Sequence, residues 1–394
     1  MPRLLFSSAG RRLRIFGILV LTVPLVAEPK FPRISSAMEA AIAAGEINGA
    51  VTLVSSAEEI LHWKAHGYAD LAKTKPMKPD TIFWVASMTK LVTAASVLAL
   101  KDDGKLRIED EVAKYLPEFK DLRTPSGRLA RLTLLQLLTH TSGLTEAPAD
   151  VSRSARTLAD LIPSYVAKPT QFEPGTQWRY CQSGMNTLAR LVEVLSGQPF
   201  ETFVSERFFH YMQMNDTTFY LTEEQAARMA EPYARNKATG ALEPRPIPIV
   251  NGSLTSRDRP PLGAGGLFTT APDFERFCEM LLNDGIYGAR IYLRRESVML
   301  MRQSHTAGIE GVFAPMLGHA WGLGCAVVEE PQGVTAMLSP GTFGHSGAFG
   351  TQSWMDPTRK AVLILMVHRA GFPMPDDNPV RQAFQQSATD ALDE

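Results

Sequence analysis

The chain has 394 residues, of which 45% are hydrophobic and 21% charged, and its formal net charge is −1. This composition excludes a disordered or collagen-like chain, and the length suits one large, two-lobed α/β or α+β unit. The near-neutral charge offers no electrostatic footprint for nucleic acid, which usually requires a clustered basic surface. We therefore expect a globular protein with a sizeable core and no nucleic-acid partner.

The first 27 residues differ in composition from the rest. Arginines at positions 3, 11, 12 and 14 precede an uncharged apolar run over residues 15–27. That run is shorter than the ~20 residues that cross a bilayer and is typical of the hydrophobic region of a signal peptide. We predict a signal peptide over residues 1–27, cleaved after Ala27, with an uncleaved membrane anchor as the alternative. The mature protein, residues 28–394, is then expected to be exported to the periplasm or secreted, without a stable membrane span.

The three cysteines indicate neither a disulfide framework nor a structural zinc site. They cannot all pair with one another, and the chain contains no C-x-x-C. It also lacks an H-E-x-x-H zinc motif and a glycine-rich phosphate loop of the Walker or dinucleotide type. We expect no metal and no cofactor. Unpaired cysteines in an exported protein should be buried, and Cys278 lies in an apolar helical pattern.

The first half of the mature chain predicts a short helix, a hairpin and then mostly helices. Residues 36–44 have a helical pattern, and residues 50–54 and 60–66 are typical of two strands joined by a turn. Apolar residues recur at helical spacing over 88–100, and this helix is expected to stop near Gly104. Further helical patterns, up to about residue 233, lie at 132–138, 157–166, 187–195 and 200–211.

A proline-rich segment, residues 244–261, separates this half from the next. We predict a helix that begins after Thr270, with Thr270 and Asp273 forming a capping box, and that ends at Gly285. A C-terminal helix is expected to start at Asn378-Pro379. Strands near both ends of the chain, with helices between them, predict an α+β fold whose single sheet is built from distant segments. The later strands are predicted at 321–328, 351–355 and 361–367.

Ser87-Met-Thr-Lys90 is the only S-x-x-K in the chain, and it opens the predicted helix over 88–100. A spacing of three residues places both side chains on one helix face, and the free N–H groups at the helix start favour developing negative charge. Lys90 can take the Ser87 proton only as a neutral amine. Its pKa therefore has to fall from about 10.4 towards neutrality, through burial or a nearby cation. Taken alone, the motif also fits a serine N-cap followed by a surface lysine.

Two further positions, Tyr180 and the segment 344–350, have side chains or backbone suited to catalysis, whereas a third candidate, His140, does not. Tyr180 can relay a proton to a leaving group, because a phenol near an ammonium ionises more readily; a core aromatic residue is the alternative. Residues 344–350 are glycine-rich, and a backbone N–H there can form half of an oxyanion hole; a tight turn is the alternative. His140 is expected to be a structural hydrogen-bonding residue at a helix end.

In their order along the chain, Ser87-x-x-Lys90, Tyr180-x-Gln182 and His345-x-Gly347 resemble the motifs of a known enzyme superfamily. Its members are the class C serine β-lactamases, the penicillin-binding DD-peptidases and the family VIII carboxylesterases. The likeness covers about residues 31–367 and includes the segments 137–144, 172–175, 265–273 and 344–351.

The resemblance implies an antiparallel sheet flanked by helices, next to an all-helical lobe, with the site in the cleft between them. We assign the α/β lobe to roughly residues 28–100 and 262–394, and the helical lobe to roughly residues 101–261.

The resemblance also implies a role for each matching residue. Ser87 becomes the acylated nucleophile, and Lys90 becomes its general base. Tyr180 becomes the acid/base near the leaving group, and His345 completes the catalytic group. The oxyanion hole and substrate contacts are assigned to the backbone N–H groups of Ser87 and Ala348, to Gln182 and to Gly347.

Two positions depart from the β-lactamase pattern. β-Lactamases commonly carry Asn where Gln182 stands, so the contact of that amide with the substrate has to shift or be lost. They commonly carry Lys where His345 stands, and a mostly neutral imidazole holds an antibiotic's carboxylate less well than an ammonium does. Both differences weaken the case for antibiotic hydrolysis and leave acylation intact.

We therefore predict a serine hydrolase that forms an acyl-enzyme, most readily with esters of short acyl chains. The alternatives with the same site are a β-lactamase or D-amino-acid peptidase, and a penicillin-binding module that is acylated without turnover. In each case the partner is a small-molecule ester or lactam.

Overall fold

A computed structural model of the protein describes residues 31–250, 252–309, 318–371 and 378–394. The predicted signal peptide lies outside the described residues. No helix within them is long and apolar enough to cross a membrane. The three cysteines are free and buried, as expected.

The centre of the fold is a seven-stranded sheet in the order β2-β1-β13-β12-β11-β10-β9, in which all neighbouring strands are antiparallel. Its strands come from both ends of the chain, which confirms the prediction of one sheet built from distant segments. The strands are β1 (Gly49–Ser56), β2 (Ile60–Gly67), β9 (His319–Trp321), β10 (Ala326–Val328), β11 (Phe343–Ser346), β12 (Gln352–Asp356) and β13 (Ala361–Met366).

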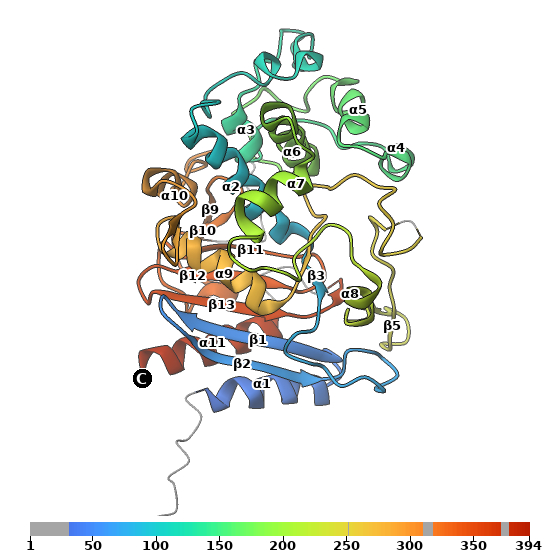
Figure 1. The fold of residues 1–394 in the computed structure, drawn as a ribbon, viewed down its shortest axis with the longest axis vertical. Helices are drawn as coiled ribbons and strands as arrows, with labels where there is room; N and C mark the ends of the chain where they lie inside the picture. Colours follow the sequence, from blue (N-terminus) through green and yellow to red (C-terminus); the bar gives the residue numbers. More distant parts are fainter. Residues whose placement is uncertain (1–30, 251, 310–317, 372–377) are drawn as a thin grey trace, which may run out of the picture.

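Both faces of this sheet are covered by helices, so its middle strands are apolar on both sides. Along β13, Val362 and Ile364 pack into one core cluster, and Leu363 and Leu365 pack into another. This follows from the alternation of side chains along a strand. Figure 1 shows the helix pair α1 and α11 below the sheet and α9 above it. These helices are α1 (Pro32–Ala43), α11 (Pro379–Asp393) and α9 (Ala271–Leu282).

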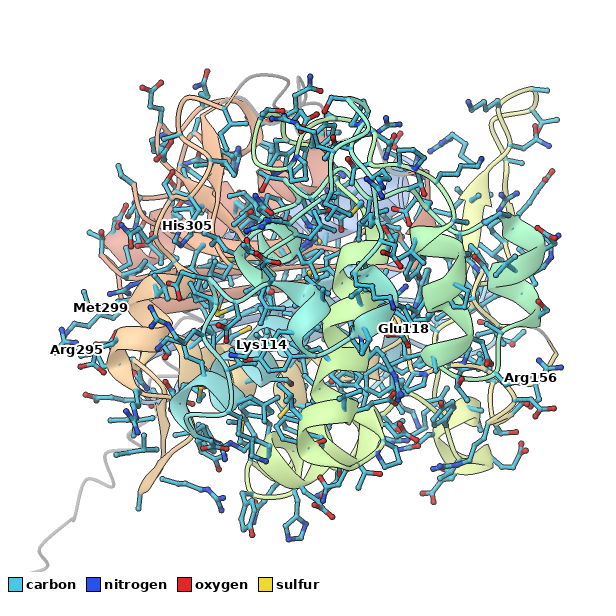
Figure 2. The ribbon with its side chains drawn as sticks, turned by 90° about the horizontal axis from the view of Figure 1, so that it is seen from above. Lys114, Glu118, Arg156, Arg295, Met299 and His305 are labelled. Carbon is cyan, nitrogen blue, oxygen red and sulfur yellow. The ribbon has the colours of Figure 1, made fainter. Side chains whose placement is uncertain are left out.

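The helical lobe lies above the sheet, and α2 (Thr89–Asp102) runs between them (Figure 1). Every residue from Thr89 to Leu100 is buried, because the helix is enclosed by both parts. Seen from above, Arg156, next to α4, and Arg295, on α10, lie at opposite borders of the molecule (Figure 2). The other helices are α3 (Leu134–Leu138), α4 (Ala149–Ser154), α5 (Ile162–Val166), α6 (Gln182–Ser196), α7 (Phe200–Val204), α8 (Glu223–Ala227) and α10 (Arg295–Met301).

Short strands complete the structure outside the main sheet. The segment 101–261 contains two of them in addition to its helices, β4 (Tyr233–Arg235) and β5 (Leu242–Pro244). β4 lies between β5 and β14 (Arg369–Ala370) and pairs with both. The other short pairs are β3 (Phe83–Trp84) with β6 (Phe268–Thr269) and β7 (Ile286–Tyr287) with β8 (Arg290–Ile291).

Two local predictions were wrong. The single strand expected over 321–328 is a hairpin, β9 and β10, because the chain bends between Gly322 and Gly324. A Cβ on Gly322 would lie 2.2 Å from the Met301 carbonyl oxygen, and Gly324 has a φ of +70°.

The capping box predicted at the start of α9 is only half formed. The Thr270 hydroxyl accepts the N–H of Asp273 at 3.3 Å. The Asp273 carboxylate, however, accepts hydrogen bonds from the N–H of Asp216 and the hydroxyl of Thr217 instead of returning one to the cap. A tertiary contact thus replaces the local one.

Candidate active site

Ser87 lies in a tight 3-10 turn, residues Ala86–Met88, that leads directly into α2. The preceding residue, Ala86, has a φ of +46°, a left-handed conformation that costs a non-glycine residue about 1–3 kcal/mol and is concentrated at functional sites. The Thr89 hydroxyl holds this turn by donating to the Ala86 carbonyl at 2.6 Å. Ser87 is therefore presented by a rigid, strained turn at the beginning of a buried helix.

Lys90 is fully buried, one turn after Ser87. Its Nζ lies 3.2 Å from Ser87 Oγ, 2.8 Å from Gln182 Oε1 and 2.5 Å from the Ala264 carbonyl oxygen. Burial lowers the pKa of Lys90 from its usual 10.5 to about 7. A neutral amine has two hydrogens, and the two acceptors other than Ser87 can take both. Its lone pair then faces the Ser87 hydroxyl, which is the geometry a general base requires.

Helix α6 supplies one of those acceptors and positions the other. Gln182 is its first residue, and Asn186 follows one turn later on the same face. The Asn186 side-chain oxygen accepts the N–H of Ala264 at 3.0 Å and so fixes the loop whose carbonyl holds Lys90. Gln182 thus contacts Lys90, a contact that the resemblance to β-lactamases did not suggest.

Glu146 holds the beginning of α6 in place. Its carboxylate accepts the backbone N–H of Gln182 and, at 3.1 Å, that of Ser183. Burial raises the pKa of Glu146, and these two N–H groups oppose that shift by favouring the ionised form. Glu146, Asn186 and Ala264 were not identified from the sequence. Only the spacing of Gln182 and Asn186 on one helix face was available as a signal.

Tyr180 lies beside Ser87 and Lys90. Its hydroxyl is 3.4 Å from His345 Nε2 and shares a hydrogen bond with Ser87, and Lys90 Nζ lies 4.7 Å from its ring centre. The expectation that Tyr180 ionises readily is wrong. Burial raises its pKa above the usual value, because desolvation of the phenolate outweighs the hydrogen bond with Ser87. The ring packs on that of His140 at 4.6 Å, and burial keeps this histidine neutral by lowering its pKa.

His345 is on β11 and is held in one tautomer. Its Nδ1 lies 2.7 Å from the Ser346 carbonyl oxygen. A carbonyl can only accept, so Nδ1 carries the proton and Nε2 is free to accept from Tyr180. Burial, followed by the charge of Lys90, lowers the pKa of His345 to about 3. The imidazole is therefore uncharged at neutral pH.

Ala348 lies in the turn between β11 and β12, and this turn abuts the segment that carries Ser87. A Cβ on Gly347 would lie 2.1 Å from Thr351 Oγ1 and 2.6 Å from the Val85 carbonyl oxygen, so only glycine fits there. The Thr351 hydroxyl also donates to the Val85 carbonyl at 3.4 Å. The two segments whose N–H groups were assigned to the oxyanion hole are thus in direct contact.

A cavity of about 230 Å³ opens at Ser87. All the side chains and turn residues assigned from the sequence line it except Lys90, which is buried beneath Ser87. Three buried tryptophans form much of its wall: Trp178, Trp321 and Trp354. No short motif marks them, because they are far apart along the chain. Among the described residues, no cluster of three or more His, Cys, Asp or Glu side chains could hold a metal ion.

Comparison with known proteins agrees with this architecture. The family model described as Beta-lactamase matches residues 34–386. Esterase EstB of Burkholderia gladioli is 28% identical over 372 residues, covering 86% of this chain and 90% of the esterase. Penicillin-binding protein 4 of Amycolatopsis lactamdurans is 31% identical over 296 residues, covering 74% of this chain and 72% of that protein.

The fold is also shared with a solved structure. EstCE1, described as a hydrolase with promiscuous acyltransferase activity, superposes with a TM-score of 0.80 at 23% identity, covering 91% of this chain and 97% of that one. The family model matches most of the chain, including the Ser87 turn, the buried lysine and the strands of the central sheet. The chain therefore belongs to the beta-lactamase family and is a serine hydrolase.

Proposed function

We propose that the protein hydrolyses carboxylic esters of short acyl chains through an acyl-enzyme on Ser87. The observation that carries the proposal is Lys90 Nζ, which is buried, has a pKa of about 7 and lies 3.2 Å from Ser87 Oγ. At neutral pH a substantial fraction of this amine is uncharged and can accept the Ser87 proton.

The proposed reaction has two stages. Ser87 Oγ transfers its proton to Lys90 and attacks the ester carbonyl carbon, while the N–H groups of Ser87 and Ala348 stabilise the oxyanion. The alcohol leaves with a proton delivered through Tyr180, which Lys90 then reprotonates. A water molecule next attacks the acyl-enzyme, releases the carboxylic acid and restores the Ser87 hydroxyl.

Three features favour a short-chain ester over a β-lactam or a D-amino-acid peptide. His345 is neutral, with a pKa of about 3, so it supplies no charge for an antibiotic's carboxylate at the position where β-lactamases use a lysine. The Gln182 amide oxygen is already engaged by Lys90. The small, tryptophan-walled cavity suits a short apolar group.

Replacing Ser87 tests the proposal. We expect Ser87→Ala to abolish hydrolysis of p-nitrophenyl butyrate while its far-UV circular dichroism and unfolding midpoint stay close to those of the wild type. Ser96→Ala is a matched control on the same helix, because its buried hydroxyl donates only to the Val92 carbonyl of that helix, at 2.8 Å, and we expect it to keep the wild-type activity. Retained activity in Ser87→Ala would remove the assignment.

The two alternative functions, a β-lactamase and a penicillin-binding module, predict different assay results for the same protein. Faster turnover of a chromogenic cephalosporin than of the ester would favour a β-lactamase. Permanent labelling of Ser87 by a fluorescent penicillin, with ester release limited to one equivalent, would favour a penicillin-binding module.

A further inference from the structure

Arg381 contacts the turn that carries the assigned oxyanion N–H, and it lines the same cavity as Ser87. It lies in the first turn of α11 and is only 6% exposed. Its Nη2 donates to the Gly347 carbonyl oxygen at 3.3 Å and to the Thr351 carbonyl oxygen at 3.4 Å. These are the residues on either side of the turn 348–350, so one guanidinium holds both ends of it.

The same two carbonyls also close the turn internally. The Gly347 N–H donates to the Thr351 carbonyl at 2.7 Å, and the Gly350 N–H donates to the Gly347 carbonyl at 3.1 Å. Each oxygen therefore accepts one backbone hydrogen bond and one from Arg381. A carbonyl oxygen has two lone pairs, so both acceptors are fully used.

The geometry of one peptide unit links Arg381 to catalysis. The Gly347 carbonyl and the Ala348 N–H belong to the same planar, trans peptide, so they point in opposite directions. A donor that fixes the carbonyl on the α11 side also fixes the N–H on the other side. A cation on the carbonyl oxygen further polarises the amide and makes its N–H a stronger donor.

We propose that Arg381 is a positioning residue that orients and polarises the Ala348 N–H of the oxyanion hole through the Gly347–Ala348 peptide. This inference rests on the proposed function, because the assignment of the Ala348 N–H to the oxyanion hole is part of that function. Arg381 contacts no reacting atom in this scheme and acts only through the peptide.

The surroundings of Arg381 suit this role. The Asn378 side chain accepts the N–H groups of Val380 and Arg381, both at 3.1 Å, and so anchors the helix turn from which the guanidinium extends. Burial lowers the pKa of Arg381 to about 10, which leaves it charged at neutral pH. A planar guanidinium can reach two carbonyls with fixed geometry, which a lysine ammonium does less well.

The test compares Arg381→Lys and Arg381→Gln with the wild type on two substrates, p-nitrophenyl butyrate and a p-nitrophenyl ester with a terminal carboxylate on its acyl chain. We expect kcat to fall by about 10- to 100-fold on both, with KM nearly unchanged, because loss of an oxyanion-hole donor costs at least as much. Arg381→Lys should be affected less than Arg381→Gln. A butylboronic acid, whose adduct with Ser87 imitates the tetrahedral intermediate, should bind more weakly in proportion to the loss of kcat.

Arg359→Gln is the matched control. Arg359 ties the far end of α11 to the sheet through Asp393 and Asp356, at 2.7 and 3.0 Å, and has no contact with the turn. We expect this variant to lose stability and to keep the wild-type kcat.

Three results would overturn the inference. The first is wild-type kcat and boronate affinity in both Arg381 variants. The second is a loss confined to the anionic ester and expressed in KM, which would make Arg381 a substrate-binding residue. The third is an equal loss of kcat in Arg359→Gln, which would mean that Arg381 only anchors α11. An inactive wild type that forms no acyl adduct would overturn the proposed function itself, so the two failures are distinguishable.

Discussion

Lys90 shows how a single buried residue can serve function at the expense of stability. The amine is enclosed by oxygen atoms from Ser87, Gln182 and Ala264, and desolvation lowers its pKa to about 7. In the unfolded chain the same amine keeps its proton up to a pH near 10.5. Folding at neutral pH therefore either removes a proton from this group or buries a charge, and both oppose the folded state.

This cost should be visible as a pH-dependent stability difference. Between pH 7 and pH 10.5 the unfolded state binds one more proton at Lys90 than the folded state, so the free energy of unfolding rises with pH. We expect the stability of the wild type, relative to Lys90→Met, to increase by roughly 2 kcal/mol between pH 7 and pH 9, since one pH unit corresponds to about 1.4 kcal/mol. Urea unfolding of both proteins at the two pH values measures it. If the free energies of unfolding of the wild type and Lys90→Met changed equally with pH, the pKa of Lys90 would not be lowered in the folded protein.

At the scale of elements, α6 organises the site, and Glu146 anchors its first turn. The negative charge of Glu146 also favours the protonated form of Lys90, although desolvation is the larger influence on that lysine. We expect Glu146→Gln to move the pH midpoint of ester hydrolysis to a lower value, because the ammonium loses a nearby anion. Glu146→Ala should in addition lose about 1 kcal/mol of stability, as expected for a missing helix cap.

The matched control for Glu146 is Glu193, which lies on the helix that Glu146 anchors. Glu193 pairs with Arg190 at 2.9 Å on the second half of α6. Glu193→Gln should leave the pH midpoint where it is, and a shift in both variants would assign the effect to helix stability rather than to the charge at Lys90.

Elements with local signals could be predicted from the sequence. The helical repeat over 88–100 became α2, the hairpin at 50–66 became β1 and β2, and Asn378 caps α11 as expected. Ser87, Lys90 and the glycine-rich turn could be singled out because they form short motifs, and the structure brings them together around one cavity. The Glu146 cap, the contact of Gln182 with Lys90 and the cavity wall depend on tertiary packing, which short-range patterns do not encode.

At the scale of the whole molecule, the site exists because the two ends of the chain build one sheet. The turn after β11 meets the segment before Ser87 only when β13, β12 and β11 extend from the hairpin near the N-terminus. The Gly347–Val85 contact then sets the distance between the two assigned oxyanion donors. We expect a Gly347→Ala variant to separate these segments and to lose activity for that reason.

Export also concerns the whole chain, and we propose it from the N-terminal sequence. The basic start and the apolar run over 15–27 are typical of a signal peptide. We expect protein recovered from outside the cytoplasm of a bacterial host to begin at Glu28. Intact mass spectrometry measures this, and a membrane-bound chain that retains residues 1–27 would support the uncleaved anchor instead.

The claim on which the account depends is that an uncharged amine activates the serine. The pH dependence of the pre-steady-state acylation rate, followed by release of p-nitrophenol from excess enzyme, tests it most directly. A protonated Lys90 cannot accept the Ser87 proton, so the rate should fall about tenfold per pH unit at acid pH and level off above a midpoint near 7. An optimum near pH 5, or a midpoint close to 10, would contradict the account.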